Sequence, residues 1–216
     1  MDLGVIARNF PFMAGGLLLT FELALITIAG GFLVGVVLAL CRLSSRSWLY
    51  YPATVYVHFF RGLPLILVIF WLYFLSPVVT GSSLKAFNAA IISFVLFEAA
   101  YFAEIIRAGV QSLSRGQIMA AYSTGLTQFQ SARHVILPQA VRNMVPALVT
   151  QAVIIFQDTS LAYVIGLREF LRRVNLVDAR EARSVELYLF AGLVYFIICS
   201  VGSMAGSRLE KRTKRS

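Results

Sequence analysis

The sequence predicts an all-α integral membrane protein with five transmembrane helices, because of its composition and its apolar runs. Of its 216 residues, 59% are hydrophobic and 13% are charged, and the mean hydropathy is +0.79. A water-soluble domain of this size does not combine so little charge with so much apolar surface. The chain also contains five apolar runs, each close to or above the roughly 20 residues that span the hydrocarbon of a bilayer.

The five runs differ in the polar residues that they contain. The first holds one charged residue, Glu22, together with glycines that favour close packing between helices. The second carries Arg61, Gly62 and Pro64 in its middle, where glycine and proline can break a helix. We expect the spans at 12–40, 50–75, 87–106, 144–167 and 187–204.

The distribution of basic residues predicts the orientation of the chain. Five spans place the termini on opposite sides, and one side collects eleven Arg and Lys residues against seven on the other. Because the cytoplasmic side of a membrane protein is the more basic one, we expect an external N-terminus and a cytoplasmic C-terminus. Residues 2–9 lack a basic start, so no cleavable signal peptide is predicted. We expect Cys41 and Cys199 to be free thiols.

A mixed polar and apolar segment, residues 117–138, separates the third and fourth runs. Its apolar positions follow the three- and four-residue spacing of one helix face. We expect two short helices that meet at Gly125, and a new element that starts at Pro138, because proline fits a first helical turn. Such a two-faced segment must lie against headgroups or another protein. The apolar face consists of Ile118, Tyr122, Gly125, Phe129, Ala132 and Ile136.

The same segment resembles the coupling loop of ABC importer membrane subunits. Their motif places two alanines, a glycine and a Leu-Pro pair at the spacing found here at 120–121, 125 and 137–138. Met119 stands where that motif has a glutamate. The resemblance implies that the apolar face anchors the loop on the transmembrane body, while the polar face around 122–128 contacts an ATPase.

Nearly the whole chain is similar to the polar amino acid permeases. FEAAY at 97–101 with FQD at 156–158 looks most like their glutamate/aspartate branch. The likeness implies a type I ABC importer permease fold in a bacterial cytoplasmic (inner) membrane, with one domain at 1–216, a coupling loop at 108–138 and a basic tail at 205–216. Other similar stretches are FRGLPL at 60–65, AYFAEIIR at 100–107, SRGQ at 114–117 and QDTSL at 157–161.

The resemblance also implies a transport subunit that works with partners. These are a cytoplasmic ATP-binding cassette ATPase, a periplasmic or extracellular solute-binding protein, and a second permease subunit, like or unlike, within the membrane lipid. The chain has no G-x-x-x-x-G-K-[ST] loop, so we expect no enzymatic ATP hydrolysis of its own and no cofactor. His58 and His134 are isolated, so we expect no metal, and we expect no nucleic acid. The residues expected to couple to the ATPase are Gln117, Met119, Ala120, Ala121, Tyr122, Gly125, Leu126 and Pro138.

Polar residues inside the spans predict a substrate site. If a helix begins at Tyr51, Arg61 lies roughly 15 Å inside, near the midplane, and Asp158 lies at a similar depth. This pair suits a zwitterion, with Arg61 on the α-carboxylate and Asp158 on the α-ammonium. Alternatively, the two charges pair with each other or with a second subunit. The predicted substrate-binding residues are Arg61, Gly62, Glu98, Gln157, Asp158, Thr159 and Ser160.

The remaining charges leave alternatives open. Glu98 either shapes the pocket or binds the second subunit, and Glu104 and Arg107, one turn apart, are expected to form an ion pair. Residues 168–186 are either a docking face for the binding protein or a solvated amphipathic loop. The predicted function is ATP-driven import of polar amino acids, in particular glutamate or aspartate. The alternatives are neutral or basic amino acids, or an ion-coupled secondary carrier.

Overall fold

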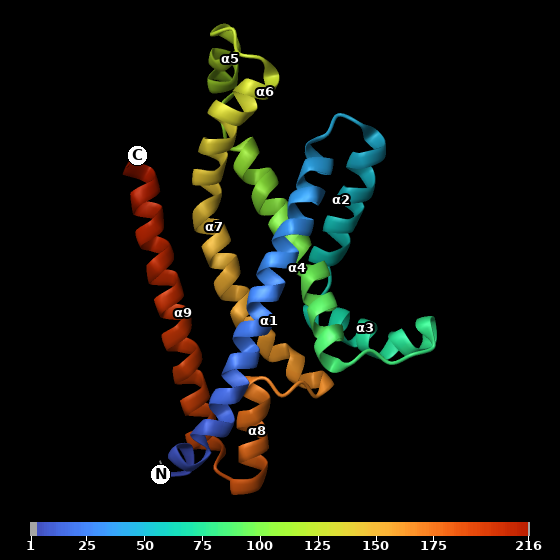
Figure 1. The fold of residues 1–216 in the computed structure, drawn as a ribbon, viewed down its shortest axis with the longest axis vertical. Helices are drawn as coiled ribbons and strands as arrows, with labels where there is room; N and C mark the ends of the chain where they lie inside the picture. Colours follow the sequence, from blue (N-terminus) through green and yellow to red (C-terminus); the bar gives the residue numbers. More distant parts are fainter. Residues whose placement is uncertain (1–3, 216) are drawn as a thin grey trace.

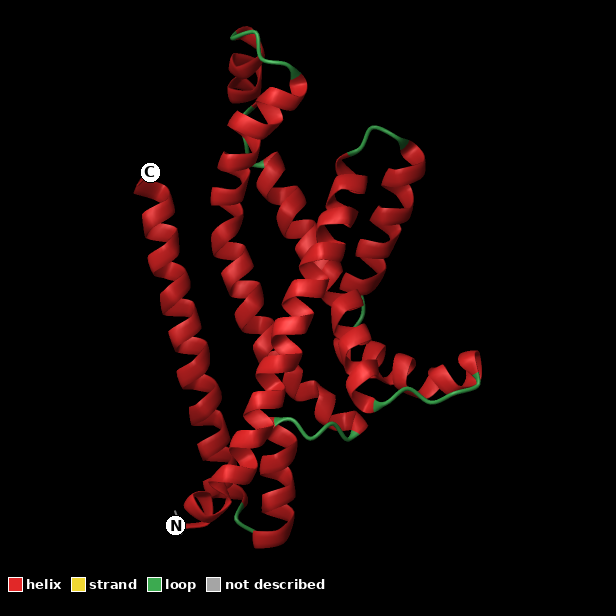
Figure 2. Ribbon diagram, viewed as in Figure 1, coloured by secondary structure: helices red, strands yellow, loops and turns green. Residues whose placement is uncertain are grey.

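The computed structural model describes residues 4–215, apart from the side chains at 115, 118 and 209–215. Every element in this part of the chain is a helix, joined by short turns and loops (Figure 2). The predicted all-α class is therefore confirmed. The elements are α1 (Gly4–Leu43), α2 (Ser47–Arg61), α3 (Leu65–Thr80), α4 (Ala86–Gln111), α5 (Arg115–Ser123), α6 (Gln128–Ser131), η1 (Ala132–Ile136), α7 (Leu137–Asp158), η2 (Thr159–Ile165), α8 (Phe170–Glu181) and α9 (Ser184–Arg215).

Within the described residues, four helical stretches are long and apolar enough to cross a membrane, and a bent pair makes up to five. The bent pair is α2 with α3, whose axes differ by 102°. The bend confirms the predicted break, since Pro64 has no N–H with which to continue the helical ladder. Gly62 closes α2 with a 3.0 Å hydrogen bond from its N–H to the His58 carbonyl. From this point α3 leaves the bundle sideways (Figure 1).

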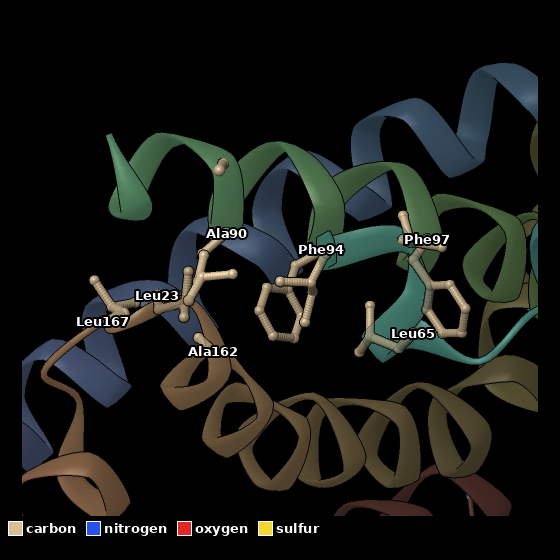
Figure 3. Packing of buried hydrophobic residues seen from close by; sticks show 11 residues of the cluster. Leu23, Leu65, Ala90, Phe94, Phe97, Ala162 and Leu167 are labelled. Carbon is tan, nitrogen blue, oxygen red and sulfur yellow. The ribbon is translucent and has the colours of Figure 1, made fainter. Parts of the chain in front are cut away.

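The pair α1 and α4 forms the centre of the bundle (Figure 1). Glycine lets their backbones approach: a Cβ added at Gly35 would lie 2.6 Å from the Cβ of Phe102. Such contact through small residues is how helices pack in a membrane, where burial of apolar surface drives little association. Beside this contact, α3 and η2 close an apolar cluster around Phe94 and Leu65 (Figure 3). The cluster holds the helix break and the end of α7 in place.

The fourth run departs from prediction at its start. Pro138 lies in the first turn of α7, which begins at Leu137, as expected, but no break in the helical chain precedes it. Instead, α6, the π-helical turn η1 and α7 form one continuous helical stretch. In η1 the N–H of Leu137 bonds the carbonyl of Ala132, five residues back. This wider turn accommodates the missing N–H of the proline without a break.

The two ends of the molecule carry different elements. The short helices α5 and α6 project from one end, toward which the C-terminal part of α9 also runs, while the N-terminus and α8 lie at the other (Figure 1). The sequence left two interpretations of residues 168–186, a solvated amphipathic loop or a docking face. The segment contains the helix α8, in which Phe170, Val174 and Val177 are buried. These side chains pack in one cluster with Val5 and Met13 of α1.

Candidate functional site

Arg61 is the last residue of α2, directly before the helix break. Its guanidinium therefore lies near backbone N–H and C=O groups that no longer form helical hydrogen bonds. The guanidinium carbon lies 5.5 Å from the centre of the Tyr101 ring, within the range of a cation–π contact. Its Nη1 lies 3.8 Å from Oε2 of Glu104, and the Arg61 side chain remains 40% exposed. A half-exposed guanidinium on an aromatic platform is open to an anionic ligand.

Asp158 is the last residue of α7 and is partly buried. Among the ion pairs of the described residues, Arg61 joins Glu104 and not Asp158. The alternative in which Arg61 and Asp158 neutralise each other is therefore wrong for this conformation. Asp158 has no ion-pair partner among the pairs of the described residues, and Arg61 keeps only its 3.8 Å contact with Glu104.

The other predicted site residues fall into two groups. Gly62 and Gln157 are exposed and Ser160 is partly exposed, so they are accessible beside Arg61 and Asp158. Thr159 is fully buried, and its hydroxyl donates a 2.6 Å hydrogen bond to the carbonyl of Phe156. That bond helps to end α7, so the Thr159 hydroxyl stabilises the turn instead of facing the site.

Glu98 lies fully inside the bundle on α4. Its Oε2 accepts a 2.7 Å hydrogen bond from Nε2 of Gln151 on α7, and its Oε1 has no partner among the described residues. Because Glu98 has no exposed surface, a second subunit could reach it only if the helices moved apart. Gln151 is not among the residues predicted from the sequence, although a glutamine inside an apolar run is a signal of a functional or packing role.

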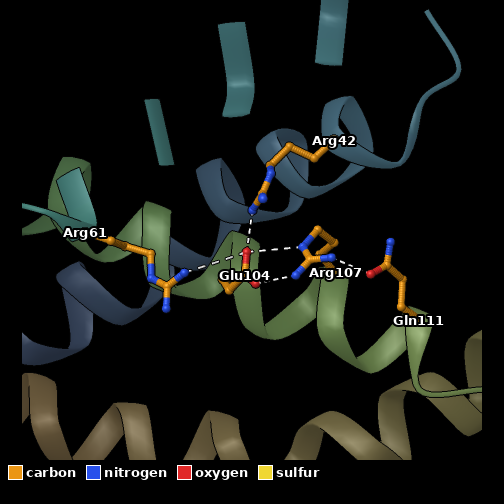
Figure 4. Close-up of polar contacts among 5 residues, drawn as sticks. All are labelled: Arg42, Arg61, Glu104, Arg107 and Gln111. Atoms are coloured by element: carbon orange, nitrogen blue, oxygen red, sulfur yellow. Dashed lines mark hydrogen bonds and ion pairs between the residues drawn. The ribbon is translucent and has the colours of Figure 1, made fainter. Parts of the chain in front are cut away.

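Three arginines converge on Glu104 (Figure 4). The predicted pair with Arg107 is confirmed, with Nη2 and Nε of Arg107 bonding the two carboxylate oxygens. Arg42, in the last turn of α1, approaches Oε2 of Glu104 to 2.5 Å, and its side chain is only 7% exposed. Arg107 also donates to the Gln111 amide. No local pattern could have revealed the contact with Arg42, because 62 residues separate it from Glu104.

The segment 115–131 forms two short helices, α5 and α6, as predicted. Gly125 joins them with a φ of +81°, a conformation that favours glycine. Ser114 accepts from the N–H of Gln117 to cap α5. Thr127 and Gln130 form a reciprocal capping box that starts α6. The chain thus fixes the shape of the loop locally.

The predicted anchoring of the apolar face on the transmembrane body is wrong for Phe129 and Tyr122, although Ile136 is partly buried. Phe129 is 72% exposed and Tyr122 is 39% exposed, while the side chain of Ile118 lies outside the described residues. The reason is the position of α5 and α6, which project beyond the ends of the long helices (Figure 1). With Met119, itself 62% exposed, these aromatic rings present an apolar surface at the tip of the molecule.

At the opposite end, Glu169 anchors α8. The carboxylate is fully buried and accepts from the N–H groups of Leu171 and Arg172 at 2.9 and 2.6 Å. Burial raises the pKa of Glu169 to about 7, although these two N–H groups and the hydroxyls of Tyr195 and Thr20 oppose the shift. The Thr20 hydroxyl also accepts from the N–H of Phe170. This capping role of Glu169 is not among the predictions from the sequence.

No group of three His, Cys, Asp or Glu side chains within the described residues could hold a metal ion. The polar groups of the spans can interact with a solute through charge and hydrogen bonds. They are the half-exposed Arg61, the partly buried Asp158 and the buried Glu98. Such an arrangement can bind and orient a small charged solute.

Comparison with known proteins identifies the family. Residues 31–215 match the family "Binding-protein-dependent transport system inner membrane component". The glutamate/aspartate import permease protein GltK of Escherichia coli O157:H7 is 43% identical, with 98% of each chain covered. The arginine transport system permease protein ArtQ of Bacillus subtilis is 31% identical, over 99% of this chain and 98% of ArtQ.

The fold has a counterpart among solved structures. The crystal structure of an amino acid ABC transporter with histidines contains a chain with a TM-score of 0.93 and 30% identity. The alignment covers 98% of this chain and 99% of that one, which confirms the predicted type I importer permease fold. The chain belongs to the family of binding-protein-dependent transport system inner membrane components, as an amino-acid ABC transporter permease subunit.

Proposed function

We propose that this chain is the permease subunit through which an ATP-driven importer passes glutamate and aspartate. The observation that carries the proposal is Arg61, a half-exposed guanidinium that sits at a helix break and is not neutralised by Asp158. A guanidinium binds a carboxylate through two parallel N–H groups. Identity of 43% to a glutamate/aspartate import permease supports the same substrate class.

In the proposed site Arg61 binds a carboxylate of the substrate and Asp158 binds its α-ammonium group. Gly62 brings the chain backbone close to the substrate, because it carries no side chain, and Gln157 and Ser160 supply hydrogen bonds. Glu98 sets the buried wall of the site through its bond to Gln151. Thr159 acts indirectly, since its hydroxyl holds the turn after Asp158.

The energy comes from a partner ATPase, which in this proposal docks on the coupling loop. The exposed apolar surface of Met119, Tyr122 and Phe129 supports docking of the ATPase. Aromatic side chains that become buried provide most of the binding energy at protein interfaces, so this surface suits docking better than the polar face around 122–128. In this proposal α5, α6 and the C-terminus lie in the cytoplasm. The binding protein then docks at the end that carries α8, and a second permease subunit completes the pathway in the lipid.

Transport in a reconstituted system tests the proposal. The chain, its ATPase and its binding protein are placed in liposomes, and ATP-dependent uptake of radiolabelled glutamate is measured against unlabelled aspartate, glutamine, histidine and arginine. We expect aspartate alone to compete strongly. Uptake by liposomes that contain the permease without the ATPase would instead indicate an ion-coupled carrier.

Basic amino acids are a second candidate substrate class. Glu98 on α4 and Asp158 at the end of α7 are both acidic residues of the spans, and two carboxylates favour a cationic side chain. The 31% identity to an arginine permease points the same way. Competition by arginine but not aspartate in the same assay would select this class.

A further inference from the structure

The cluster around Glu104 holds more positive charge than one carboxylate can balance. Three guanidinium groups, those of Arg42, Arg61 and Arg107, face the single carboxylate of Glu104 (Figure 4). Arg107 and Arg42 hydrogen-bond the carboxylate directly. A partly buried cluster with excess positive charge attracts a further anion, because burial weakens the screening of that charge by water.

The three arginines are not equivalent. The Nη1 of Arg61 lies 3.8 Å from Oε2 of Glu104, against 2.5 Å for Nη1 of Arg42. The same Oε2 already accepts from Nε of Arg107 at 3.2 Å, so Arg61 approaches an oxygen that has two closer donors. Its side chain is also the most exposed of the three, at 40% against 7% for Arg42 and 26% for Arg107. The contact of Arg61 with Glu104 is therefore the easiest of the three to replace.

We propose that Glu104 is an internal competitor for the substrate: it holds Arg61 when the site is empty and yields it to a substrate carboxylate. Glu104 is thus a positioning residue that sets how strongly Arg61 binds an acidic amino acid. This inference rests on the proposed function of Arg61. The guanidinium carbon lies 5.5 Å from the centre of the Tyr101 ring, a cation–π contact that needs no N–H donor, so the N–H groups stay available for either carboxylate.

The exchange leaves Glu104 paired. After Arg61 moves to the substrate, Arg42 from α1 and Arg107 from α4 still hydrogen-bond the carboxylate. The partly buried charge of Glu104 therefore keeps its partners. It follows that the two stronger partners of Glu104 affect the substrate indirectly. Removing Arg107 frees Glu104 to hold Arg61 more tightly, whereas removing the Glu104 charge releases Arg61.

Two substitutions therefore shift substrate affinity in opposite directions, which a merely structural ion pair would not do. Equilibrium binding of radiolabelled glutamate is measured on the purified permease–ATPase complex in lipid nanodiscs, without binding protein or nucleotide. We expect Glu104→Gln to lower the Kd about threefold and Arg107→Gln to raise it about threefold, the size of a solvent-accessible ion pair. Co-purification of the ATPase and a single cooperative thermal transition show that each variant is folded, even where the loss of an ion pair lowers the Tm.

Glu104→Asp provides a second measurement in case Glu104→Gln does not fold. The shorter side chain withdraws first from Arg61, the most distant partner, so the Kd should again fall. Shifts of the same sign in the Glu104 and Arg107 variants, or no shift in either, would overturn the competitor role while glutamate binding by the wild-type complex upholds the site. Failure of the wild-type complex to bind any amino acid would overturn the proposed site and this inference together.

Discussion

Gln151 on α7 donates a 2.7 Å hydrogen bond to the buried carboxyl group of Glu98 on α4. The bond joins two spans at a depth where water cannot replace a lost partner, since Glu98 is fully buried and Gln151 is 7% exposed. The second oxygen of Glu98 has no partner within the described residues. Within the described residues, the bond from Gln151 is thus the only hydrogen bond that the Glu98 side chain forms.

Gln151→Leu should destabilise the bundle. The change leaves the Glu98 carboxyl without its donor, and an unsatisfied buried group of this kind costs about 1–3 kcal/mol. Thermal unfolding in detergent, followed by a thiol-independent dye or by circular dichroism, measures the effect. The double variant Glu98→Leu with Gln151→Leu should recover much of the stability, because both polar partners are removed together. Additive losses in the double variant would contradict a direct bond between the two side chains.

Arg61→Ala should abolish uptake while the ATPase still co-purifies. Arg61 provides the carboxylate-binding group of the proposed site and lies on α2, apart from the coupling loop. Arg61→Lys keeps the charge but loses the two parallel N–H groups, so it should restore only a small part of the uptake. Radiolabelled uptake into liposomes measures both variants. Unchanged uptake in Arg61→Ala would remove this residue from the site.

Phe129→Asp should detach the ATPase without unfolding the spans. The ring is 72% exposed at the tip of the coupling loop, so its loss affects a partner surface and not the core. Gln128→Asp is the matched control, since it places the same charge on the neighbouring exposed residue of α6. Pull-down of the ATPase by tagged permease measures the difference. Equal retention by Phe129→Asp and wild type would place the docking surface elsewhere.

Gly125→Val should uncouple the transporter. A Cβ at Gly125 meets no atom within 4 Å, but its φ of +81° is strained for a β-branched residue. The turn between α5 and α6 must therefore change shape while the spans remain folded. Gly125→Asn tolerates this backbone conformation better and serves as the control. We expect the valine variant to lose substrate-stimulated ATP hydrolysis and the asparagine variant to keep most of it.

The sequence predicted the features of the fold that depend on local chemistry. Apolar length predicted the spans, Gly62 with Pro64 predicted the break, and Gly125 predicted the angle between α5 and α6. It could not predict contacts between distant residues, such as Arg42 with Glu104, because these depend on how whole helices align. The apolar face at Phe129 is a third case. Its pattern predicted that the face packs against another surface, but the pattern is the same whether that surface belongs to this chain's own helices or to another protein.

The docking of α8 should weaken as the pH around this end of the molecule rises from about 4.5 to 7. Burial raises the pKa of Glu169 from its ordinary value of 4.5 to about 7, so the docked state holds its proton over this interval while the undocked state releases it. The stability of docking therefore falls with increasing pH through this range and levels off above the higher value, at about 1.4 kcal/mol for each unit between the two pKa values. Hydrogen exchange of the α8 amides at pH 5 and pH 8, corrected for the intrinsic exchange rate, should show weaker protection at pH 8. Glu169→Gln keeps a hydrogen-bond acceptor for the N–H groups of Leu171 and Arg172 but does not titrate, so its protection should be the same at both values. A glutamine variant that retains the full pH dependence would assign the effect to another group.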